Sequence, residues 1–224
     1  MRENEEASGE PEVREMSGNA NVRFEVTGNA AWGVAMSLPH VAGANHFANE
    51  LEAHEMAVGS DPSGETFGKA HWYASAAILL SFAAVESSVD EVEDALGLPK
   101  TLSATGKHPP FWQRLDEVIA HAHGKPIEKG KGLYQRVGLL KDLRDGLAHP
   151  KLDWSNALKS YPKLTQRIVD QRLTLSPLRP DPATAFPYGC MSAGVARWAA
   201  KNARDFIQDF RVRCGLEPYG SPLD

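Results

Sequence analysis

The stretch that decides the fold is LLSFAAVESSVDEVEDAL, residues 79–96. Its apolar side chains recur every three or four residues, at Leu79, Phe82, Val85, Val89, Val92 and Leu96. This spacing places them in one stripe, because an α-helix turns once in about 3.6 residues. Gly97 and Pro99 follow, and both are typical of a helix C-terminus. The pattern predicts a helix from about Phe67 to Leu96 with the stripe facing a core.

Helical periodicity also continues on both sides of this stretch. It predicts helices at about 44–58, 110–123, 132–148 and 191–214, and a shorter one near 161–172. Glycine and proline clusters separate them, and Pro110 and Pro150 lie where a helix should begin and end. No strand–helix–strand rhythm and no internal repeat is present. The sequence therefore predicts an all-α bundle of four to five helices.

The chain divides into four expected regions. Residues 1–20 carry six Glu, two Arg and almost nothing apolar, so we expect a disordered acidic N-terminus. Residues 21–64 are expected to be an irregular N-terminal extension, with a short strand at Val22–Val26 and the first helix. The helical domain would cover 65–214, and 215–224 would be a tail. Its proline-rich connection at 150–187 is long enough to suggest a functional loop or lid.

Composition narrows the class of protein. The formal net charge of −5 argues against a general nucleic-acid coat protein, although it permits a local basic patch. Two cysteines, Cys190 and Cys214, are too few for a disulfide framework or a cysteine-rich zinc site. We expect no membrane span, no signal peptide and no cofactor, and a cytoplasmic location.

The end of the 132–148 helix carries the candidate chemistry. From Lys129 to Lys151 there are six basic residues and two acidic ones, a local net charge of +4 in an acidic chain. His149 follows the helix, where the dipole favours its cationic form, and Asp145 lies one turn before it. Arg144 is placed to hold a phosphate. Positions five apart differ by ~140° of rotation on an ideal helix, so Arg144 and His149 converge only if Gly146 and Pro150 loosen the helix end.

These residues resemble a known family. Arg144-Asp145-Gly146-Leu147-Ala148-His149 is similar to the R-x4-H motif of HEPN domains, and AAILLSFAAVE at 76–86 is similar to their Ala-rich early helix. The resemblance covers roughly 67–214 and implies an up-and-down helical bundle. Many members are metal-independent endoribonucleases of toxin–antitoxin, phage-defence or RNA-processing systems.

The resemblance also implies roles for individual residues. His149 would be the general acid–base when a ribose 2′-OH attacks the adjacent phosphate, Arg144 would hold that phosphate, and Asp145 would orient His149. Glu86 and Asp90, one turn apart, would be candidates for a supporting acidic contact, with Arg144 as the partner considered. Lys141, Lys151 and Arg136 would bind RNA. The family implies a homodimer, with RNA and an antitoxin or another protein as partners.

Three other interpretations remain open. Arg144 and His149 could simply cap the last helix carbonyls, in an inactive module that dimerises or binds a nucleotide, RNA or protein. His46, Glu50 and His54 lie on one helix face at a spacing that a metal could use, although an exposed polar stripe is the more ordinary interpretation. Trp32, Trp72, Trp112 and Trp198 are expected to be core or interface anchors rather than stacking platforms.

Overall fold

The computed structural model describes residues 35–58, 64–98, 109–148 and 161–220, and this part of the chain is all-α. Its helices are α1 (Ser37–Val58), α2 (Gly64–Ala95), α3 (Phe111–His121), α4 (Gly132–Ala148), α6 (Pro162–Asp170) and α7 (Ala193–Arg213). A 3-10 turn, η1 (Pro182–Thr184), and a short π-type segment, η2 (Ala185–Gly189), lie between α6 and α7. The acidic segment 1–20 and the expected strand Val22–Val26 lie outside the described residues.

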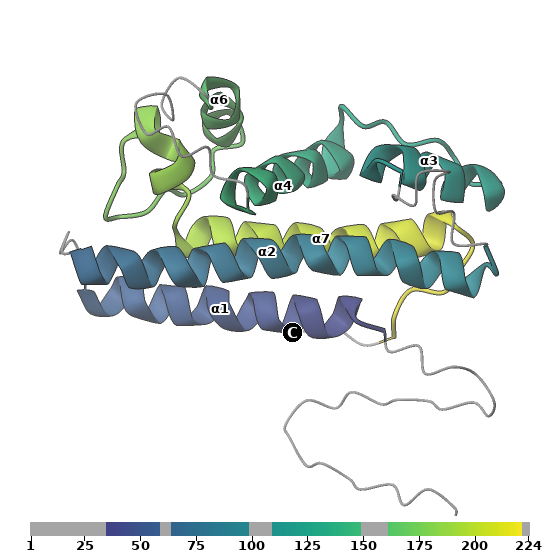
Figure 1. Ribbon diagram of the computed structural model, residues 1–224, viewed down its shortest axis with the longest axis horizontal. Helices are drawn as coiled ribbons and strands as arrows, with labels where there is room; N and C mark the ends of the chain where they lie inside the picture. The colour runs from purple at the N-terminus through teal and green to yellow at the C-terminus, as the bar shows by residue number, and fades with distance from the viewer. Residues whose placement is uncertain (1–34, 59–63, 99–108, 149–160, 221–224) are drawn as a thin grey trace, which may run out of the picture. The chain divides into compact units, whose positions relative to one another are not determined.

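The long helix α2 is the centre of the packing. It contacts α1, α7, α4 and α3, and α7 also contacts α1 and α4. Figure 1 shows α1 on one side of α2 and α7, with α4 and α3 on the other. Along the chain α1, α2, α4 and α7 alternate in direction in this view. The expected all-α packing of helices is confirmed, and the C-terminal end of α4 lies beside the segment 161–190.

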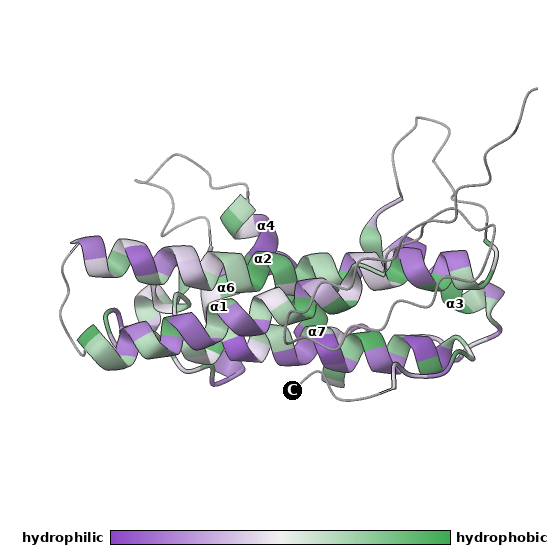
Figure 2. Ribbon diagram, turned by 90° about the horizontal axis from the view of Figure 1, so that it is seen from below, coloured by the Kyte–Doolittle hydropathy of each residue, from purple (hydrophilic) through white to green (hydrophobic). Residues whose placement is uncertain are grey.

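Small and aromatic side chains fill the core. Ala70, Ala74 and Ala77 of α2 are fully buried, and small residues of this kind allow close helix packing. The largest buried side chains come from several elements and include Phe82, Phe186, Phe206, Phe210, Leu51 and Met191. The rings of Phe206 and Phe210 stack with their centroids 5.3 Å apart. Figure 2 shows hydrophobic residues on the helix faces that meet one another and hydrophilic residues mainly outside. The core therefore runs along the length of α2 and α7.

Helix α1 belongs to this core, whereas the sequence placed it in an N-terminal extension. The compact unit begins at Ala35, and Val41, Ala44, Ala48 and Leu51 of α1 are buried. The helix also starts at Ser37 rather than near Ala44. Pro39 falls in its first turn, where the missing N–H is no loss, so it does not break the helix. The Ser37 N–H and hydroxyl instead donate to the Glu91 carboxylate, at 2.8 and 2.7 Å.

One expectation about α2 is wrong and another is narrowed. Leu79 was expected to face the core but is 37% exposed, and the adjacent Ile78 is buried in its place. Trp72 was expected to be a core or interface anchor, and its 76% exposure within this chain removes the core alternative and leaves the interface alternative. The core face of α2 is therefore rotated slightly from the stripe that the apolar residues alone predict.

By length and composition, α2 could also cross a membrane, contrary to the expectation that no segment could. It is the one helix among the described residues that meets this criterion, and half of its most apolar window is buried inside the protein. A core helix meets the same criterion. The inner face of α2 is apolar because it packs against four neighbouring helices.

Candidate functional site

Arg144 lies in the last turn of α4 and is held from two sides by carboxylates. Its Nη2 donates to Glu86 Oε1 of α2 at 2.6 Å, and its Nη1 lies 2.9 Å from Asp145 Oδ1. Its Cζ lies 4.4 Å from the centroid of the Phe82 ring, within cation–π range. The side chain is 23% exposed. The guanidinium is therefore fixed, partly desolvated and still open to solvent.

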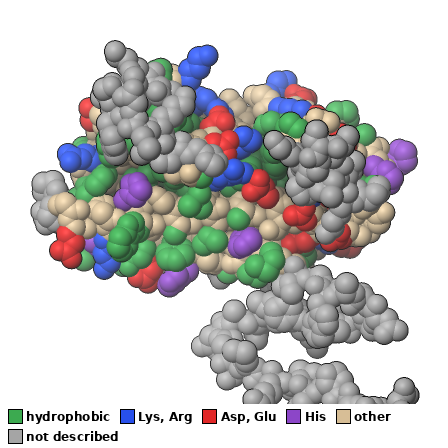
Figure 3. Space-filling view, in the orientation of Figure 1, with side chains coloured by type: hydrophobic (Ala, Val, Ile, Leu, Met, Phe, Trp, Pro, Cys, Tyr) green, Lys and Arg blue, Asp and Glu red, His purple; other side chains and the backbone are tan. Residues whose placement is uncertain are grey.

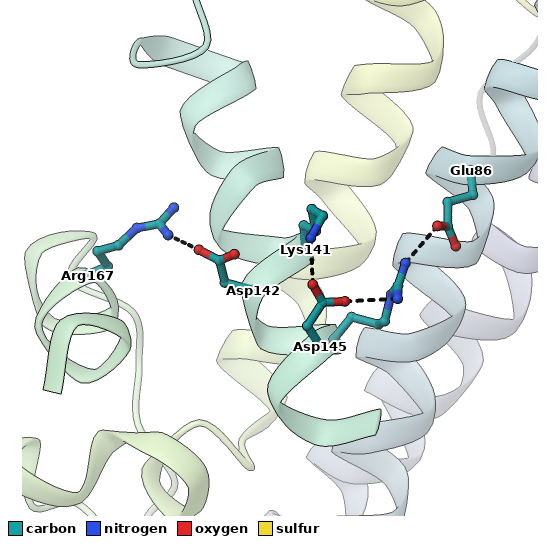
Figure 4. A network of polar contacts seen from close by, with 6 residues as sticks. Glu86, Lys141, Asp142, Asp145 and Arg167 are labelled. Carbon is teal, nitrogen blue, oxygen red and sulfur yellow. Dashed lines mark hydrogen bonds and ion pairs between the residues drawn. The ribbon is translucent and has the colours of Figure 1, made fainter. Parts of the chain in front are cut away.

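Asp145 joins Arg144 to a second cation. Lys141 Nζ lies 2.5 Å from Asp145 Oδ2, one helical turn earlier on α4. Figure 4 shows Lys141 and Asp145 on one helix and Glu86 on the neighbouring one, and the contacts of Arg144 with Asp145 and Glu86 connect the two helices. We call these four residues the Arg144 cluster. Its two cations and two carboxylates leave no net formal charge, so its electrostatics depend on how the charges are arranged.

Burial raises the pKa of Glu86 above its ordinary value, and this is the largest influence on the group. Arg144 opposes that shift, because a nearby cation favours the carboxylate. Asp145 and Asp90 raise the pKa further by like-charge repulsion, and Lys141 lowers it. The net effect is a carboxylate that protonates more readily than an exposed glutamate.

Asp90 has a different partner from the one considered in the sequence. It forms an ion pair with Arg114 of α3, and Arg114 also pairs with Glu93 of α2. The Arg114 and Glu93 side chains are 14% and 10% exposed. Asp90 therefore helps to fix α3 on α2, while Glu86 alone of the two makes the contact with Arg144.

The three residues that were expected to bind RNA do not form one group in the structure. Lys141 belongs to the Arg144 cluster. Arg136 Nε donates to Asn202 Oδ1 of α7 at 2.6 Å, and Asn202 is buried. Lys151 lies outside the described residues, as does His149, which follows Ala148, the last residue of α4. The structure thus brings Arg144, Asp145, Glu86 and Lys141 together, and it leaves Arg136 in a contact between helices.

Several basic residues of the stretch from Lys129 to Lys151 form ion pairs with carboxylates. Lys129 Nζ lies 2.5 Å from Asp116 Oδ2, and Lys131 Nζ lies 2.8 Å from Glu128 Oε2. Arg167 of α6 forms an ion pair with Asp142 on the flank of α4, as Figure 4 also shows. Asp116 and Glu128, from outside that stretch, therefore partly offset the net charge of +4 counted along the sequence, whereas Arg167 adds a cation beside Asp142.

Gly146 does not loosen α4 as expected, so any convergence of Arg144 and His149 must come from the chain after Ala148, which lies outside the described residues. The helix α4 continues without a break through Ala148. A Cβ atom on Gly146 would come within 2.6 Å of Phe186 Cζ, and Phe186 is buried. Glycine at this position makes room for the aromatic ring of η2. The Phe186 ring in turn meets Tyr161 edge-on, with 4.8 Å between ring centroids.

Sequence reasoning missed this support for the α4 end, and also a neighbouring hollow. The hollow has a volume of about 570 Å³ and is lined by Phe67, Tyr188, Leu178, Pro180, Arg179, Asp181 and Thr184. Arg179 Cζ lies 5.6 Å from the Phe67 ring centroid. The lining thus combines two aromatic rings with one cation, Arg179, and one carboxylate, Asp181. The spacing of these residues along the chain gives no signal that they meet.

The metal alternative finds no support in the arrangement of side chains. The described residues contain no group of three or more His, Cys, Asp or Glu side chains placed to hold a metal ion. His54 Nε2 instead lies 2.9 Å from the carbonyl oxygen of Thr66. His54 therefore helps to join the end of α1 to the start of α2.

Comparisons with known proteins give no match to a family model, a curated protein or a solved structure. The fold and site therefore define the class by themselves: an all-α bundle with a fixed arginine–carboxylate cluster at a helix end.

Proposed function

We propose that this protein is a HEPN-like, metal-independent endoribonuclease that uses Arg144 and His149 at the end of α4. The observation that supports the proposal best is the position of Arg144. Its guanidinium is oriented by Glu86 and Asp145, rests on Phe82, and keeps 23% of the side chain exposed. An arginine held in this way is prepared to bind a phosphate through two hydrogen bonds.

The proposed reaction needs a base, an acid and a phosphate clamp. His149 would take the proton of a ribose 2′-OH as that oxygen attacks phosphorus, and would return a proton to the 5′ oxygen as the P–O5′ bond breaks. Arg144 would stabilise the additional negative charge on the phosphoryl oxygens. The products would be a 2′,3′-cyclic phosphate and a 5′-hydroxyl. Asp145 would orient His149, and Lys141 and Lys151 would contact the RNA backbone.

Phosphate binding would require Arg144 to exchange carboxylate contacts for phosphate contacts. Protonation of Glu86 would ease this exchange, because burial raises its pKa. Glu86 is therefore proposed as a positioning residue that holds the guanidinium before substrate arrives. An antitoxin or another protein that covers the α4 end would be the natural regulator of such an enzyme.

One observation favours a second function, an inactive HEPN-like binding module. The Arg144 cluster carries no net formal charge, and both carboxylates contact the guanidinium directly. An arginine saturated in this way would be a structural link between α4 and α2. Such a protein would bind an RNA, nucleotide or protein partner without cutting RNA.

RNA cleavage distinguishes the two functions. Purified protein would be incubated with 5′-labelled RNA in the presence of EDTA, and the ends of the products would be identified. We expect cyclic-phosphate ends from the wild type, and a loss of about 10²-fold or more in rate for Arg144→Ala and for His149→Ala.

The matched control is Arg167→Ala, which removes another arginine paired with an α4 carboxylate but lies outside the Arg144 cluster. It should cut RNA at close to the wild-type rate. Equal cleavage by the wild type and His149→Ala would overturn the nuclease proposal. Absence of any cleavage, with RNA binding retained, would favour the binding module.

A further inference from the structure

The hollow beside η2 is lined by side chains of several chemical kinds, and none of them belongs to the Arg144 cluster. Its volume of about 570 Å³ is within the range of small-molecule sites. Arg179 and Asp181 give it one charge of each sign and lie on either side of Pro180. The rings of Phe67 and Tyr188 give it an apolar wall. We call this site the Arg179 hollow.

Hydrogen bonds hold the backbone that carries the two charged residues. Ser176 is fully buried, and its N–H donates to the carbonyl oxygen of Gly189 at 2.7 Å. The carbonyl oxygen of Ser176 accepts from the Arg179 N–H at 3.0 Å, which closes one turn. The Asp181 carboxylate accepts from the Ala183 N–H at 2.9 Å, which fixes the next turn and the direction of that carboxylate. A ligand would therefore have little of this site to order when it binds.

Arg179 and Asp181 face the same hollow without pairing with each other. The backbone of Asp181 is extended, with φ at −68° and ψ at 116°, and side chains two positions apart in an extended segment point to the same side. Among the described residues neither side chain makes an ion pair, and the Arg179 guanidinium has the Phe67 ring as its neighbour. Both charged groups are therefore available to one ligand.

The hydrogen-bonding character of these two groups identifies the ligand. A guanidinium only donates, through a planar fork, and a carboxylate only accepts. The ligand must therefore present a pair of acceptors beside a pair of donors. Guanine does so, because O6 and N7 accept from arginine in its commonest base contact, and the adjacent N1–H and N2 amine donate. Its flat ring would stack on Tyr188, since aromatic side chains are the usual platforms for unpaired bases.

Other ligands match this pair of groups less well. Adenine carries an amine where guanine has O6 and an acceptor where guanine has N1–H, so it would meet both Arg179 and Asp181 with the wrong character. Pyrimidines have no N7 beside their carbonyl oxygen, so an arginine fork would find one acceptor there instead of two. A simple phosphate or carboxylate would be repelled by Asp181. Guanine is therefore the base that satisfies both charged groups.

The Arg179 hollow also lies close to the C-terminal end of α4. Phe186, two positions before Tyr188, is in contact with Gly146 of α4, and Figure 1 shows the segment between α6 and α7 beside that helix end. Figure 3 shows Lys and Arg side chains interspersed with Asp and Glu on the described part of one face. A nucleic-acid strand on such a face would gain little from bulk charge, so a contact with a base would contribute more to its selection.

We propose that the Arg179 hollow binds a guanine base. Arg179 donates to O6 and N7, Asp181 accepts from N1–H and the N2 amine, and Tyr188 stacks on the ring. The base belongs either to a free guanine nucleotide or to an RNA strand that reaches the end of α4. Only the second source rests on the proposed nuclease, in which the hollow would select a guanine near the bond that is cut.

Calorimetric titration of the full chain with nucleoside monophosphates tests the site without any RNA cleavage. GMP, IMP and AMP share their ribose and phosphate, so differences in affinity report on the base alone. IMP lacks only the N2 amine of GMP. We expect GMP to bind about tenfold or more tightly than AMP, with IMP between the two. Equal affinities for GMP and AMP, or no binding of GMP at millimolar concentration, would overturn the proposal.

Two conservative variants assign the selectivity to the hollow. Arg179→Lys keeps the charge but loses the planar fork, so the preference for GMP over AMP should fall by about tenfold. Asp181→Asn can still accept from the Ala183 N–H, but it should lose the preference for GMP over IMP. Arg172→Lys is the matched control, because Arg172 is exposed on the same connection and outside the hollow, and both preferences should stay. Wild-type preferences in Arg179→Lys and Asp181→Asn would place any guanine site elsewhere and end the proposal.

Short uridine oligonucleotides that contain one guanosine or one inosine distinguish the two sources of the base. If the base comes from RNA, the guanosine oligonucleotide should bind more tightly than GMP, and cleavage should fall at a fixed distance from the guanosine. If the base comes from a free nucleotide, GMP should bind more tightly than the oligonucleotide. Cleavage that ignores guanosine, together with equal affinities for GMP and AMP, would remove the guanine site and leave the nuclease proposal standing. Selective binding of GMP without cleavage would keep the guanine site and count against the nuclease.

Discussion

Gly146 of α4 and Phe186 of η2 are in direct contact, although they lie forty positions apart in the sequence. A Cβ atom on Gly146 would lie 2.6 Å from Phe186 Cζ and 3.2 Å from Cε1. Phe186 is buried against Tyr161, so its ring has little room to move away. This contact fixes the segment between α6 and α7 against the helix end that carries the Arg144 cluster.

Replacing Gly146 with alanine should therefore destabilise the protein. Overpacking of a filled site typically costs about 1–3 kcal/mol, and the better helix propensity of alanine returns up to about 1 kcal/mol. We expect a net loss of about 1–2 kcal/mol in the free energy of unfolding, measured by urea denaturation. Phe186→Leu in the same chain should recover part of the loss, as a double-mutant cycle would show.

The matched control for that substitution is Gly138→Ala in the same helix. A Cβ atom at this position would meet Trp112 Cζ2 at 3.4 Å, an ordinary contact distance. Helix propensity should then dominate and raise stability by up to about 1 kcal/mol. Equal effects of the two alanines would mean that the Phe186 ring does not restrict Gly146.

Arg114 should matter more for stability than any exposed ion pair. Its removal would leave Asp90 and the nearly buried Glu93 without their cation. Loss of one partner from a buried ion pair typically costs about 3–5 kcal/mol. Because Asp90 is half exposed, we expect Arg114→Ala to lose about 2–4 kcal/mol, which chemical denaturation can measure. Lys129→Ala breaks the more exposed pair with Asp116 and should change stability by less than about 1 kcal/mol.

Arg136 should contribute more to the stability of the fold than to the affinity for RNA. Arg136→Ala would remove the donor to the buried amide oxygen of Asn202, and an unsatisfied buried acceptor costs about 1–3 kcal/mol. Gln135→Ala, at the exposed neighbouring position, should stay within about 0.5 kcal/mol of the wild type. Filter binding should show Arg136→Ala, under conditions where it is folded, with RNA affinity close to wild type. A large loss of affinity without a loss of stability would restore Arg136 to the RNA-binding set.

The pH dependence of stability gives a test of Glu86. Its pKa is raised in the folded protein, chiefly by burial, so the folded state binds a proton more tightly than the unfolded state does. The contribution of Glu86 to stability therefore falls as pH rises through the range just above 4.5, its ordinary value. The glutamine side chain in the Glu86→Gln variant cannot titrate. The thermal midpoint of the variant should therefore rise relative to that of the wild type as pH rises through this range. If the thermal midpoint of the variant instead rose relative to the wild type toward acid pH, a raised pKa of Glu86 would be contradicted.

The helices could be predicted from the sequence where local signals agree. Both ends of α4 were predicted as they occur, because an apolar period lies between Gly132 and the residues before Pro150. The start of α1 at Ser37 was missed, because a proline at position 39 argues against a helix there unless it lies in the first turn, which accepts proline. The prediction that Leu79 faces the core failed because it considered only large side chains. A stripe defined by large residues alone overlooks Ala70, Ala74 and Ala77, whose burial sets the orientation of α2.

The candidate site could be predicted only in part. The family resemblance offered Glu86 and Asp90 as candidate partners of Arg144, and of the two only Glu86 makes that contact. The Arg114 pairing with Asp90 and the Phe186 contact with Gly146 depend on how distant segments pack. No spacing rule gives such pairings, because they are set by tertiary structure rather than by helical period.

The central position of α2 also has a consequence for the order in which the chain folds. Its first partner, α1, is separated from it only by residues 59–63, so the two can form a hairpin at small entropic cost of loop closure. Its largest remaining partner, α7, begins almost a hundred residues after α2 ends. During synthesis the hairpin would therefore leave the ribosome with the α7-facing side of α2 still uncovered. That makes the nascent chain most prone to aggregate, and most dependent on chaperones, until Ala193–Arg213 emerges.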